Sequence, residues 1–172
     1  MKALLSTRPG PPETLEYADA PDPVAGEGEV VIAVKAAGVN FPDALIIEDK
    51  YQFKPERPFA PGGEVAGIIE SVGAGVTHVK AGQRVIGSLG WNGFAERAKA
   101  QAARVLPIPD AMPFDEASAF ILTYGTSYYA LKDRGQMKAG EVVLILGAAG
   151  GVGIASIELA NAAGALAIAA VS

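Results

Sequence analysis

The C-terminal stretch of this chain constrains the fold more than any other part of the sequence. Residues 141–146 form a short apolar run that predicts a buried strand. A glycine-rich turn follows at 147–153, and the next residues predict a helix that Gly164 ends in a left-handed cap. Residues 165–171 predict a second apolar strand. The expected buried face of the helix consists of Ile154, Ile157, Leu159 and Ala160. Strand, glycine turn, helix and strand in this order are typical of a dinucleotide-binding fold.

The chemistry of the turn is that of a phosphate site. A phosphate needs hydrogen-bond donors and positive potential, and the N-terminus of a helix supplies both. We place the glycine fingerprint on Ala148, Gly150 and Gly153, with alanine in place of the usual first glycine. Gly151 is expected to let the backbone approach a pyrophosphate, and Gly153 to let the helix pack on the strand. The alternative is a glycine-rich turn that binds no ligand. The predicted cofactor-binding residues of the turn are Ala148, Ala149, Gly150, Gly151, Val152 and Gly153.

Residues 1 to about 110 predict a β-rich domain. Short strands are expected at 2–5, 14–17, 29–37, 64–72, 83–87, 94–99 and 104–108. Many short strands separated by turn signals are typical of a small barrel or sandwich. Between these strands, residues 41–48 predict a short helix, with Asn40 as its N-cap and Pro42 early in its first turn.

Two domains are expected. Residues 1–120 form the β-rich domain, and residues 121–172 hold a connector helix and the start of the dinucleotide-binding domain. Helical segments are expected at 115–119 and 126–133. A complete dinucleotide-binding fold has about six strands, whereas this chain stops after the second. The sequence therefore predicts that these 172 residues are an N-terminal fragment of a longer protein.

Composition excludes several classes of function. Half of the residues are hydrophobic, which is ample for a core, and the net charge of −5 argues against a nucleic-acid partner. The chain has no cysteine, so disulfides, thiolate metal sites and cysteine nucleophiles are excluded. The N-terminus has no signal-peptide pattern, and the apolar C-terminal end is too short and too polar for a membrane span. A cytoplasmic protein without a membrane partner is expected.

Five motifs carry a family resemblance along all 172 residues. They are KAAGVNFPD (35–43), PGGEVAGIIESVG (61–73), KAGQRVIG (80–87), YGTSYYAL (124–131) and GAAGGVG (147–153). In this order they resemble the zinc-independent quinone oxidoreductase branch of the medium-chain dehydrogenase/reductase superfamily. The resemblance implies an α/β fold with a β-rich part. A GroES-like β-barrel catalytic domain, without its C-terminal return, would be followed by the first βαβ unit of a truncated Rossmann fold.

The residues at the zinc-ligand positions of this superfamily argue against zinc on direct chemical grounds. Zinc members of the superfamily carry a cysteine ligand at the position of Asn40 and a histidine ligand at the position of Gly63. Asparagine and glycine cannot replace thiolate and imidazole as zinc ligands. Glu64 remains beside them, but one carboxylate makes no metal site, so no metal-binding residue is predicted.

In function, the resemblance implies an NADPH-dependent reductase that transfers hydride to a quinone or an α,β-unsaturated carbonyl (an enone). Such a protein mainly orients nicotinamide and acceptor and excludes water. The resemblance places Asn40, Asp43 and Tyr51 near the nicotinamide and substrate as candidate catalytic residues, with the Tyr51 hydroxyl as a donor to a developing oxyanion. The alternatives are that Asn40 only caps a helix, that Asp43 only supports the first helical turn, and that Tyr51 is a loop aromatic packed on the surface.

Thr126 and Ser172 complete the predicted cofactor site. By resemblance, Thr126 lies near the nicotinamide side of the cofactor, and it is also a candidate helix N-cap. Ser172 stands at the end of the second strand, where a hydroxyl in similar proteins favours the 2′-phosphate of NADPH. Tyr124 is expected to be a packing residue, and His78 to be a solvated turn histidine.

The rival interpretation is a non-enzymatic GroES-like binding or structural module. In the enzyme interpretation, the full-length protein is expected to be a homodimer that acts on a small-molecule quinone or enone. The 172-residue piece is expected to be inactive by itself.

Overall fold

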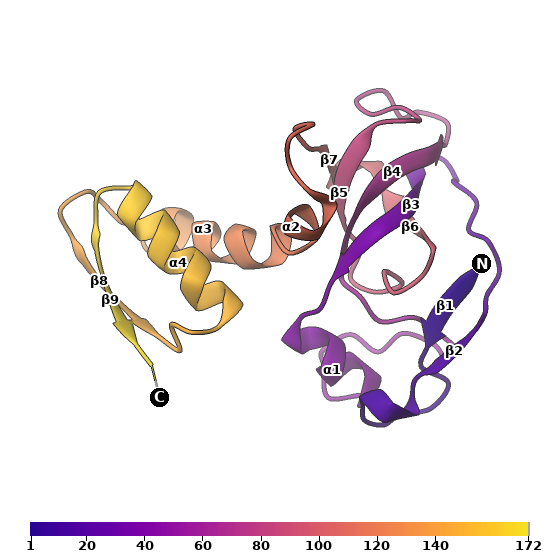
Figure 1. Ribbon diagram of the computed structural model, residues 1–172, viewed down its shortest axis with the longest axis horizontal. Helices are drawn as coiled ribbons and strands as arrows, with labels where there is room; N and C mark the ends of the chain where they lie inside the picture. The colour runs from indigo at the N-terminus through magenta and orange to yellow at the C-terminus, as the bar shows by residue number, and fades with distance from the viewer. Residues whose placement is uncertain (172) are drawn as a thin grey trace. The chain divides into compact units, whose positions relative to one another are not determined.

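The computed structural model describes residues 1–171, which divide into two compact units, residues 1–119 and residues 120–171. Figure 1 labels their elements. The strands are β1 (Lys2–Leu5), β2 (Glu16–Asp19), β3 (Glu29–Gly38), β4 (Glu64–Val72), β5 (Arg84–Ser88), β6 (Arg97–Gln101), β7 (Val105–Pro107), β8 (Val142–Leu146) and β9 (Leu166–Ala170). The α-helices are α1 (Phe41–Ile47), α2 (Phe114–Ser118), α3 (Thr126–Tyr128) and α4 (Gly151–Ala162). Two 3₁₀ turns, η1 (Pro12–Thr14) and η2 (Ala102–Arg104), and two π-helical turns, η3 (Ile121–Gly125) and η4 (Tyr129–Arg134), complete the set.

The first unit is built on a five-stranded antiparallel sheet in the order β6-β3-β4-β5-β7. The separate antiparallel pair β1-β2 is linked by isolated bridges, from Ala3 to Ala95 and from Ser6 to Phe59, to the loops that precede β6 and β4. Alternate β-branched residues of the sheet point inward and form the core, because one face of each strand must leave water. The most buried core members are Val30, Ile32, Val65, Val85 and Val105. The β-rich prediction for this region is confirmed.

Two of the predicted strands begin later than expected. Residues 12–14 form a 3₁₀ turn, and the strand expected at 14–17 begins only at Glu16. Pro11 and Pro12 fix the backbone there and supply no N–H for a strand ladder. The strand expected at 94–99 begins at Arg97. The loop before it carries Trp91, the one tryptophan of the chain, which is 36% exposed.

Helix α1 begins and ends where its residue chemistry dictates. Asn40 is the N-cap, with extended backbone at φ −127° and ψ 156°, and Pro42 lies in the first turn, so the predicted cap is confirmed. Asp49, just beyond the helix, has a left-handed φ of 57°. The inner face of α1 buries Ile46 and Ile47 against Phe59.

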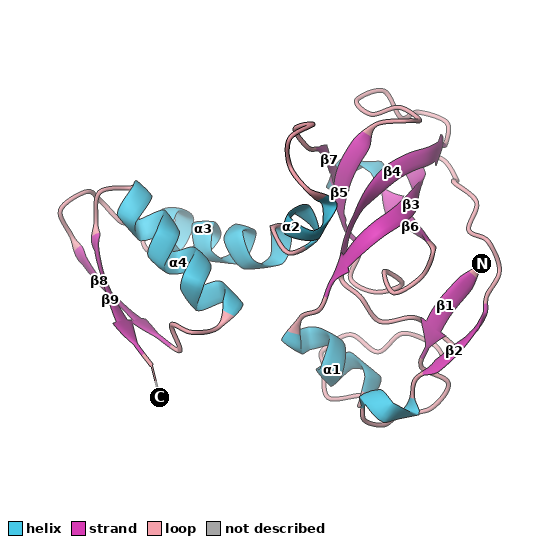
Figure 2. Ribbon diagram, viewed as in Figure 1, coloured by secondary structure: helices cyan, strands magenta, loops and turns pink. Residues whose placement is uncertain are grey.

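The second unit has the predicted order of strand, glycine turn, helix and strand. Strands β8 and β9 are parallel, paired from Val142–Leu166 to Leu146–Ala170, and α4 connects them. Figure 2 shows α4 running alongside this two-stranded sheet. Gly164 follows α4 with a left-handed φ of 77°, which confirms the predicted cap. The helical segment expected at 126–133 begins earlier, because residues 121–134 form one continuous helical run.

The buried face of α4 differs from the prediction. Ile154 is 48% exposed, whereas Ala155 and Ala160 are 1% and 0% exposed. The expectation that Ile154 lies on the buried face is therefore wrong, although Ala160 was placed correctly. The helix begins so close to the glycine turn that only small side chains fit between them, and a large aliphatic side chain is turned outward instead.

The face of the β8-β9 sheet that α4 does not cover is apolar and open. Val143 and Ala167 pack with Met137 and Ala160 on the covered side. The side chains of the open face are Val142, Leu144, Leu146, Leu166 and Ile168, which are 47–76% exposed. Parallel sheets are normally covered on both faces. Across residues 1–171, no helix is long and apolar enough to cross a membrane.

Candidate functional site

The candidate catalytic residues Asn40 and Asp43 lie together at the start of α1. The backbone N–H of Asn40 donates to Asp43 Oδ2 at 2.8 Å, and the backbone N–H of Gly62 donates to Asp43 Oδ1 at 3.0 Å. Asp43 is buried, with 6% of its surface exposed. Its carboxylate therefore ties the first turn of α1 to the loop that precedes β4. The Asp43 carboxylate accepts a hydrogen bond from the N-cap residue and so supports the first turn of α1, which is the alternative role that the sequence suggested for it.

Burial raises the pKa of the Asp43 carboxyl above its ordinary value of 3.8. Desolvation disfavours the charged form of a carboxyl. Hydrogen bonds from the backbone N–H groups of Asn40, Gly62 and Gly63 act in the opposite direction and lower the pKa, but by less. Asp43 therefore holds a proton more readily than an exposed aspartate would.

The sequence assigned no role to Glu64, which lies beside Asn40 in the structure. Asn40 Nδ2 donates to Glu64 Oε1 at 2.9 Å, and Glu64 is only 2% exposed at the start of β4. Gly38 leaves room for it, since a Cβ there would lie 2.8 Å from Glu64 Oε1 and 2.3 Å from the Ser118 carbonyl oxygen. A carboxylate at the first position of a buried strand needs a polar partner. The place of Glu64 before the apolar run of β4 was therefore the sequence feature that could have indicated its role. Within residues 1–171, no group of three or more His, Cys, Asp or Glu side chains is arranged to hold a metal ion.

A cavity of about 220 Å³ opens beside Asn40 and Asp43. It is lined by residues of β1, η1 and α1 and by Phe94, all within the first unit. Apolar concave sites with a few polar groups are the usual form of small-molecule sites.

Tyr51, the third candidate catalytic residue, is not among the described residues that line this cavity. Its ring packs on the cluster of Ile46, Ile47 and Phe59 and makes an edge contact with Phe53, with 5.8 Å between the ring centroids. The structure thus brings Asn40 and Asp43 together through hydrogen bonds and holds Tyr51 by apolar contacts.

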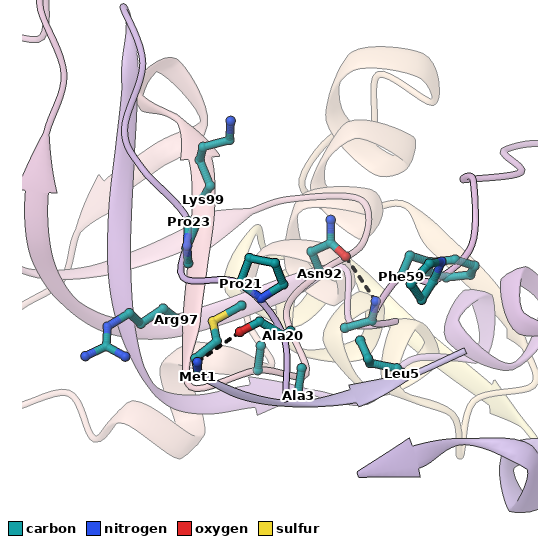
Figure 3. Close-up of a pocket in the computed structure, with 13 residues that line it drawn as sticks. Met1, Ala3, Leu5, Ala20, Pro21, Pro23, Phe59, Asn92, Arg97 and Lys99 are labelled. Atoms are coloured by element: carbon teal, nitrogen blue, oxygen red, sulfur yellow. Dashed lines mark hydrogen bonds between the residues drawn. The ribbon is translucent and has the colours of Figure 1, made fainter. Parts of the chain in front are cut away.

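A second cavity, of about 270 Å³, contains none of the predicted site residues. Figure 3 shows it between β1, the loop around Phe59 and β6, with Asn92 Oδ1 accepting a hydrogen bond from the backbone N–H of Ala60. Its cationic side chains are already paired, so they offer little attraction to an added anion. The pairs are Arg97 with Asp22 and Glu70, and Lys99 with Glu29.

The glycine turn of the second unit is shaped by two glycines. Gly147 has a left-handed φ of 65°, a conformation that glycine adopts without strain. Ala148 has no such φ, which explains why alanine is tolerated there; it is 3% exposed and its N–H donates to the Ala170 carbonyl. A Cβ on Gly153 would lie 2.6 Å from the Gly147 carbonyl oxygen and 2.7 Å from Ala148 Cα. Gly153 therefore allows close packing, but its nearest contacts are backbone atoms of the turn and not the strand that the sequence predicted.

The N-terminus of α4 faces solvent with almost no side chain in front of it. Gly150 is the N-cap and Gly151 the first helical residue, and both are exposed, as are Ala149 and Val152. The first backbone N–H groups of a helix have no acceptor within the helix, so the first turn of α4 presents donors outward. Gly150 itself donates to the Gly147 carbonyl at 3.1 Å.

Two residues of the helical run contact this turn, and the sequence did not indicate either. Ser127 is fully buried, and its hydroxyl donates to the Val152 carbonyl at 3.0 Å. Thr123 lies against Gly151, since a Cβ on Gly151 would stand 3.0 Å from Thr123 Cγ2. The only sequence feature that could have indicated these contacts is the helical spacing of Thr123 and Ser127 before the glycine turn.

Thr126 lies inside the helical run and is exposed. Both Gly125 and Thr126 have right-handed helical backbone angles, so the prediction that Thr126 caps a helix is wrong. Gly125 does not interrupt the helix, because glycine in a helix interior lowers stability without forbidding the conformation.

The remaining sequence expectations concern Ser172, Tyr124 and His78. Ser172, the candidate reader of the 2′-phosphate, lies outside the described residues. Tyr124 stacks on Phe120 as a packing residue, and its hydroxyl also donates to Glu158, which raises the pKa of Tyr124. His78 is exposed in a bend, where its Nε2 is 2.8 Å from the Ala102 carbonyl oxygen.

Known proteins resemble this chain in sequence and in fold. The family model described as the alcohol dehydrogenase GroES-like domain matches residues 26–110. A quinone oxidoreductase of Lama guanicoe is 40% identical over 164 residues, which are 94% of this chain and 50% of that protein. The chain thus spans about half the length of the curated relatives it matches.

Solved structures agree with the sequence comparison. A probable oxidoreductase from Mycobacterium abscessus superposes with a TM-score of 0.92 and 45% identity, covering 98% of this chain and 54% of that one. The quinone oxidoreductase from Thermus thermophilus, solved also as its complex with NADPH, gives a TM-score of 0.85 and 39% identity, covering 98% of this chain and 52% of that one.

Proposed function

Because this chain belongs to the zinc-independent quinone oxidoreductase branch of the medium-chain dehydrogenase/reductase superfamily, we propose that its protein is an NADPH-dependent reductase of quinones or α,β-unsaturated carbonyls. Residues 1–120 would then belong to a catalytic domain, and residues 121–172 to the start of a dinucleotide-binding domain. The observation that carries the proposal is the glycine turn at the N-terminus of α4.

The turn fits a pyrophosphate on its own geometry. Gly150 and Gly151 are exposed and bear no Cβ, so the backbone can be approached closely, and the first turn of α4 supplies unpaired donors and positive potential. The relative from Thermus thermophilus forms a complex with NADPH, which makes this dinucleotide the candidate ligand here. The proposed cofactor residues of this chain are Ala148, Ala149, Gly150, Gly151, Val152 and Gly153 of the turn, together with Thr126 and Ser172.

NADPH, when bound, supplies the hydride that reduces the acceptor. The part played by the chain is to bind and orient the reactants and to exclude water. We assign Asn40, Asp43 and Tyr51 to the reaction site. The Tyr51 hydroxyl is the candidate donor to the oxyanion that develops on the acceptor. The hydrogen bonds of Asn40 and Asp43, which are buried or partly buried, support this assignment because they hold both side chains in place.

The test is oxidation of NADPH by the complete protein, followed by the absorbance of NADPH, with a quinone and with an enone as separate acceptors. Oxidation that requires the protein and saturates with acceptor is the expected result. NADPH binding without turnover for either acceptor would instead favour a non-enzymatic GroES-like module.

Two variants separate cofactor binding from chemistry. Gly151→Val sets a branched side chain at the turn where the pyrophosphate is proposed to lie and is expected to weaken NADPH binding. Its Cβ would also stand 3.0 Å from Thr123 Cγ2, so circular dichroism is used to check that the variant keeps its fold. Tyr51→Phe removes one hydroxyl, and loss of such a donor lowers turnover by about a hundredfold or more. An enone is the sharper acceptor, because a quinone is helped by the aromaticity of its reduced form. Tyr51→Phe turnover of an enone at the wild-type rate, with NADPH affinity unchanged, would remove Tyr51 from the mechanism.

A further inference from the structure

The cavity beside Asn40 and Asp43 is almost entirely apolar. Of its ten lining residues, eight are apolar, and Asn40 and Asp43 are the other two. The larger part of its apolar wall is formed by Leu4, Leu15, Val39, Ala44, Ile47 and Phe94.

The cavity has a closed floor and an open rim. Ile47 and Pro61 are buried, with less than 2% exposed for Pro61 and 2% for Ile47, whereas Val39 is 82% exposed. The side chains of Leu4, Leu15 and Ala44 are half-buried between these extremes. An occupant could therefore enter from solvent and leave water progressively as it moves inward.

Polar atoms of both polar lining residues are already engaged in hydrogen bonds within the protein. Both carboxylate oxygens of Asp43 accept backbone hydrogen bonds, from Asn40 and from Gly62. The Asn40 side-chain amide donates to Glu64. The cavity therefore offers its occupant mainly apolar contact, and few polar atoms remain to replace the water that a polar or charged occupant would lose.

The volume of about 220 Å³ limits the size of the occupant. Pockets that enclose a whole drug-sized ligand measure about 300–1,000 Å³. A smaller apolar cavity next to a candidate catalytic residue suits one substituent of a ligand whose reactive part remains outside.

We propose that this cavity binds an aliphatic tail of the acceptor, so that the preferred substrates are quinones or enones that carry an alkyl substituent. This inference rests on the proposed reductase function. It adds a substrate class to that function and assigns Leu4, Leu15, Val39, Ala44 and Ile47 to acceptor recognition.

The kinetic test uses the complete protein with NADPH and a series of 1,4-benzoquinones with no substituent and with n-alkyl chains of increasing length. Each methylene that enters an apolar site tightens binding by about fourfold. KM is expected to fall by this factor with each of the first few carbons and then to level off when the cavity is full. A KM that is independent of chain length would overturn the proposal.

Two variants and a control localise the effect. Ala44→Leu fills the cavity from α1 with a good helix former, and Val39→Lys sets a charge at the exposed rim, where no core packing is disturbed. Both are expected to remove the dependence of KM on chain length. Ala103→Leu makes the same enlargement at an exposed position outside the cavity and is expected to keep that dependence. Retention of the dependence in Val39→Lys and in a folded Ala44→Leu would place the tail elsewhere.

A binding test without NADPH or turnover separates this inference from the proposed function. n-Pentylbenzene is added to the protein, and methyl resonances are followed by NMR. Shifts confined to Leu4, Leu15, Val39 and Ile47, and lost in Ala44→Leu, support the site. Shifts elsewhere, or none, overturn it. A protein that shows these shifts but reduces no quinone would retain the apolar site and lose the reductase proposal.

Discussion

At the residue scale, Asn40 serves two neighbours at once. It occupies the N-cap of α1, and its side-chain amide donates to Glu64 at the start of β4. The first role depends on residues next to it in sequence, and it was predicted. The second depends on a residue 24 positions away, which no local pattern indicates. Asp43 likewise accepts one hydrogen bond from a residue nearby in sequence, Asn40, and one from a distant residue, Gly62.

Asp43 gives a prediction about pH. Because burial raises its pKa above 3.8, the folded state binds the proton more tightly than the unfolded state. The contribution of Asp43 to stability is therefore greatest at low pH and is lost as pH rises through the raised pKa. Denaturant unfolding of the wild type and of Asp43→Asn, compared from about pH 4 to pH 7, is expected to show the difference in unfolding free energy (wild type minus variant) falling with pH. A difference that grows with pH would contradict this.

Gly153 gives a prediction about packing. A Cβ there would meet backbone atoms of Gly147 and Ala148 at 2.6 and 2.7 Å, and backbone cannot rotate away as a side chain can. Gly153→Ala is expected to lower the unfolding free energy by about 1–3 kcal/mol. Gly150→Ala is the matched control, since its Cβ would be 3.5 Å from the nearest atom, an ordinary contact. Circular dichroism during urea unfolding measures both, and equal losses for the two variants would count against the packing argument.

At the scale of elements, the order of strand, glycine turn, helix and strand was predictable because each signal is local. The buried face of α4 was not, because it depends on how closely the helix lies on its neighbours: Ala155 and Ala160 are buried while Ile154 is exposed. The early start of the helical run at Ile121 was missed for a similar reason. Packing on α4, including the Ser127 bond to Val152, compensates for the weak helix propensity of Gly125.

The Val152 carbonyl provides an experiment on that packing. It accepts hydrogen bonds from Ser127, on the neighbouring helical run, at 3.0 Å and from Ser156, on the next turn of α4, at 2.7 Å. Ser127→Ala is expected to lower the unfolding free energy by about 1 kcal/mol, because it removes a buried bond between elements. Ser156→Ala is expected to cost close to nothing, since alanine is the better helix former. Urea unfolding of both variants decides, and a larger loss for Ser156→Ala would refute the role given to Ser127.

At the scale of the whole molecule, the five motifs in their order indicated the architecture, and the structure and the comparisons confirm it. The sequence pattern also contained the apolar strands β8 and β9. It did not show that α4 covers only one of their faces among the described residues. Whether a face of a sheet is covered depends on how helices and sheet pack in the folded protein, and no short stretch of sequence contains that information.

The open face of the β8-β9 sheet predicts self-association of the 172-residue chain. Exposed apolar strands with unpaired edges bind a second copy readily. Sedimentation of the wild type at rising concentration is expected to show dimers or larger species, and Leu144→Lys on the open face is expected to reduce them. Val24→Lys, at an exposed apolar position in the first unit (80% exposed, against 61% for Leu144), is the control and should sediment like the wild type. A strictly monomeric wild type at high concentration would contradict the prediction.

The position of Trp91 has a spectroscopic consequence. The one tryptophan of the chain lies in the first unit, and the second unit has none. Intrinsic tryptophan emission therefore reports the first unit alone, whereas far-ultraviolet circular dichroism reports both. If the units unfold at different denaturant concentrations, the two signals are expected to give different midpoints, and the emission midpoint belongs to Met1–Ala119. The cooperativity of unfolding between the two units can thus be measured without attaching a dye to either.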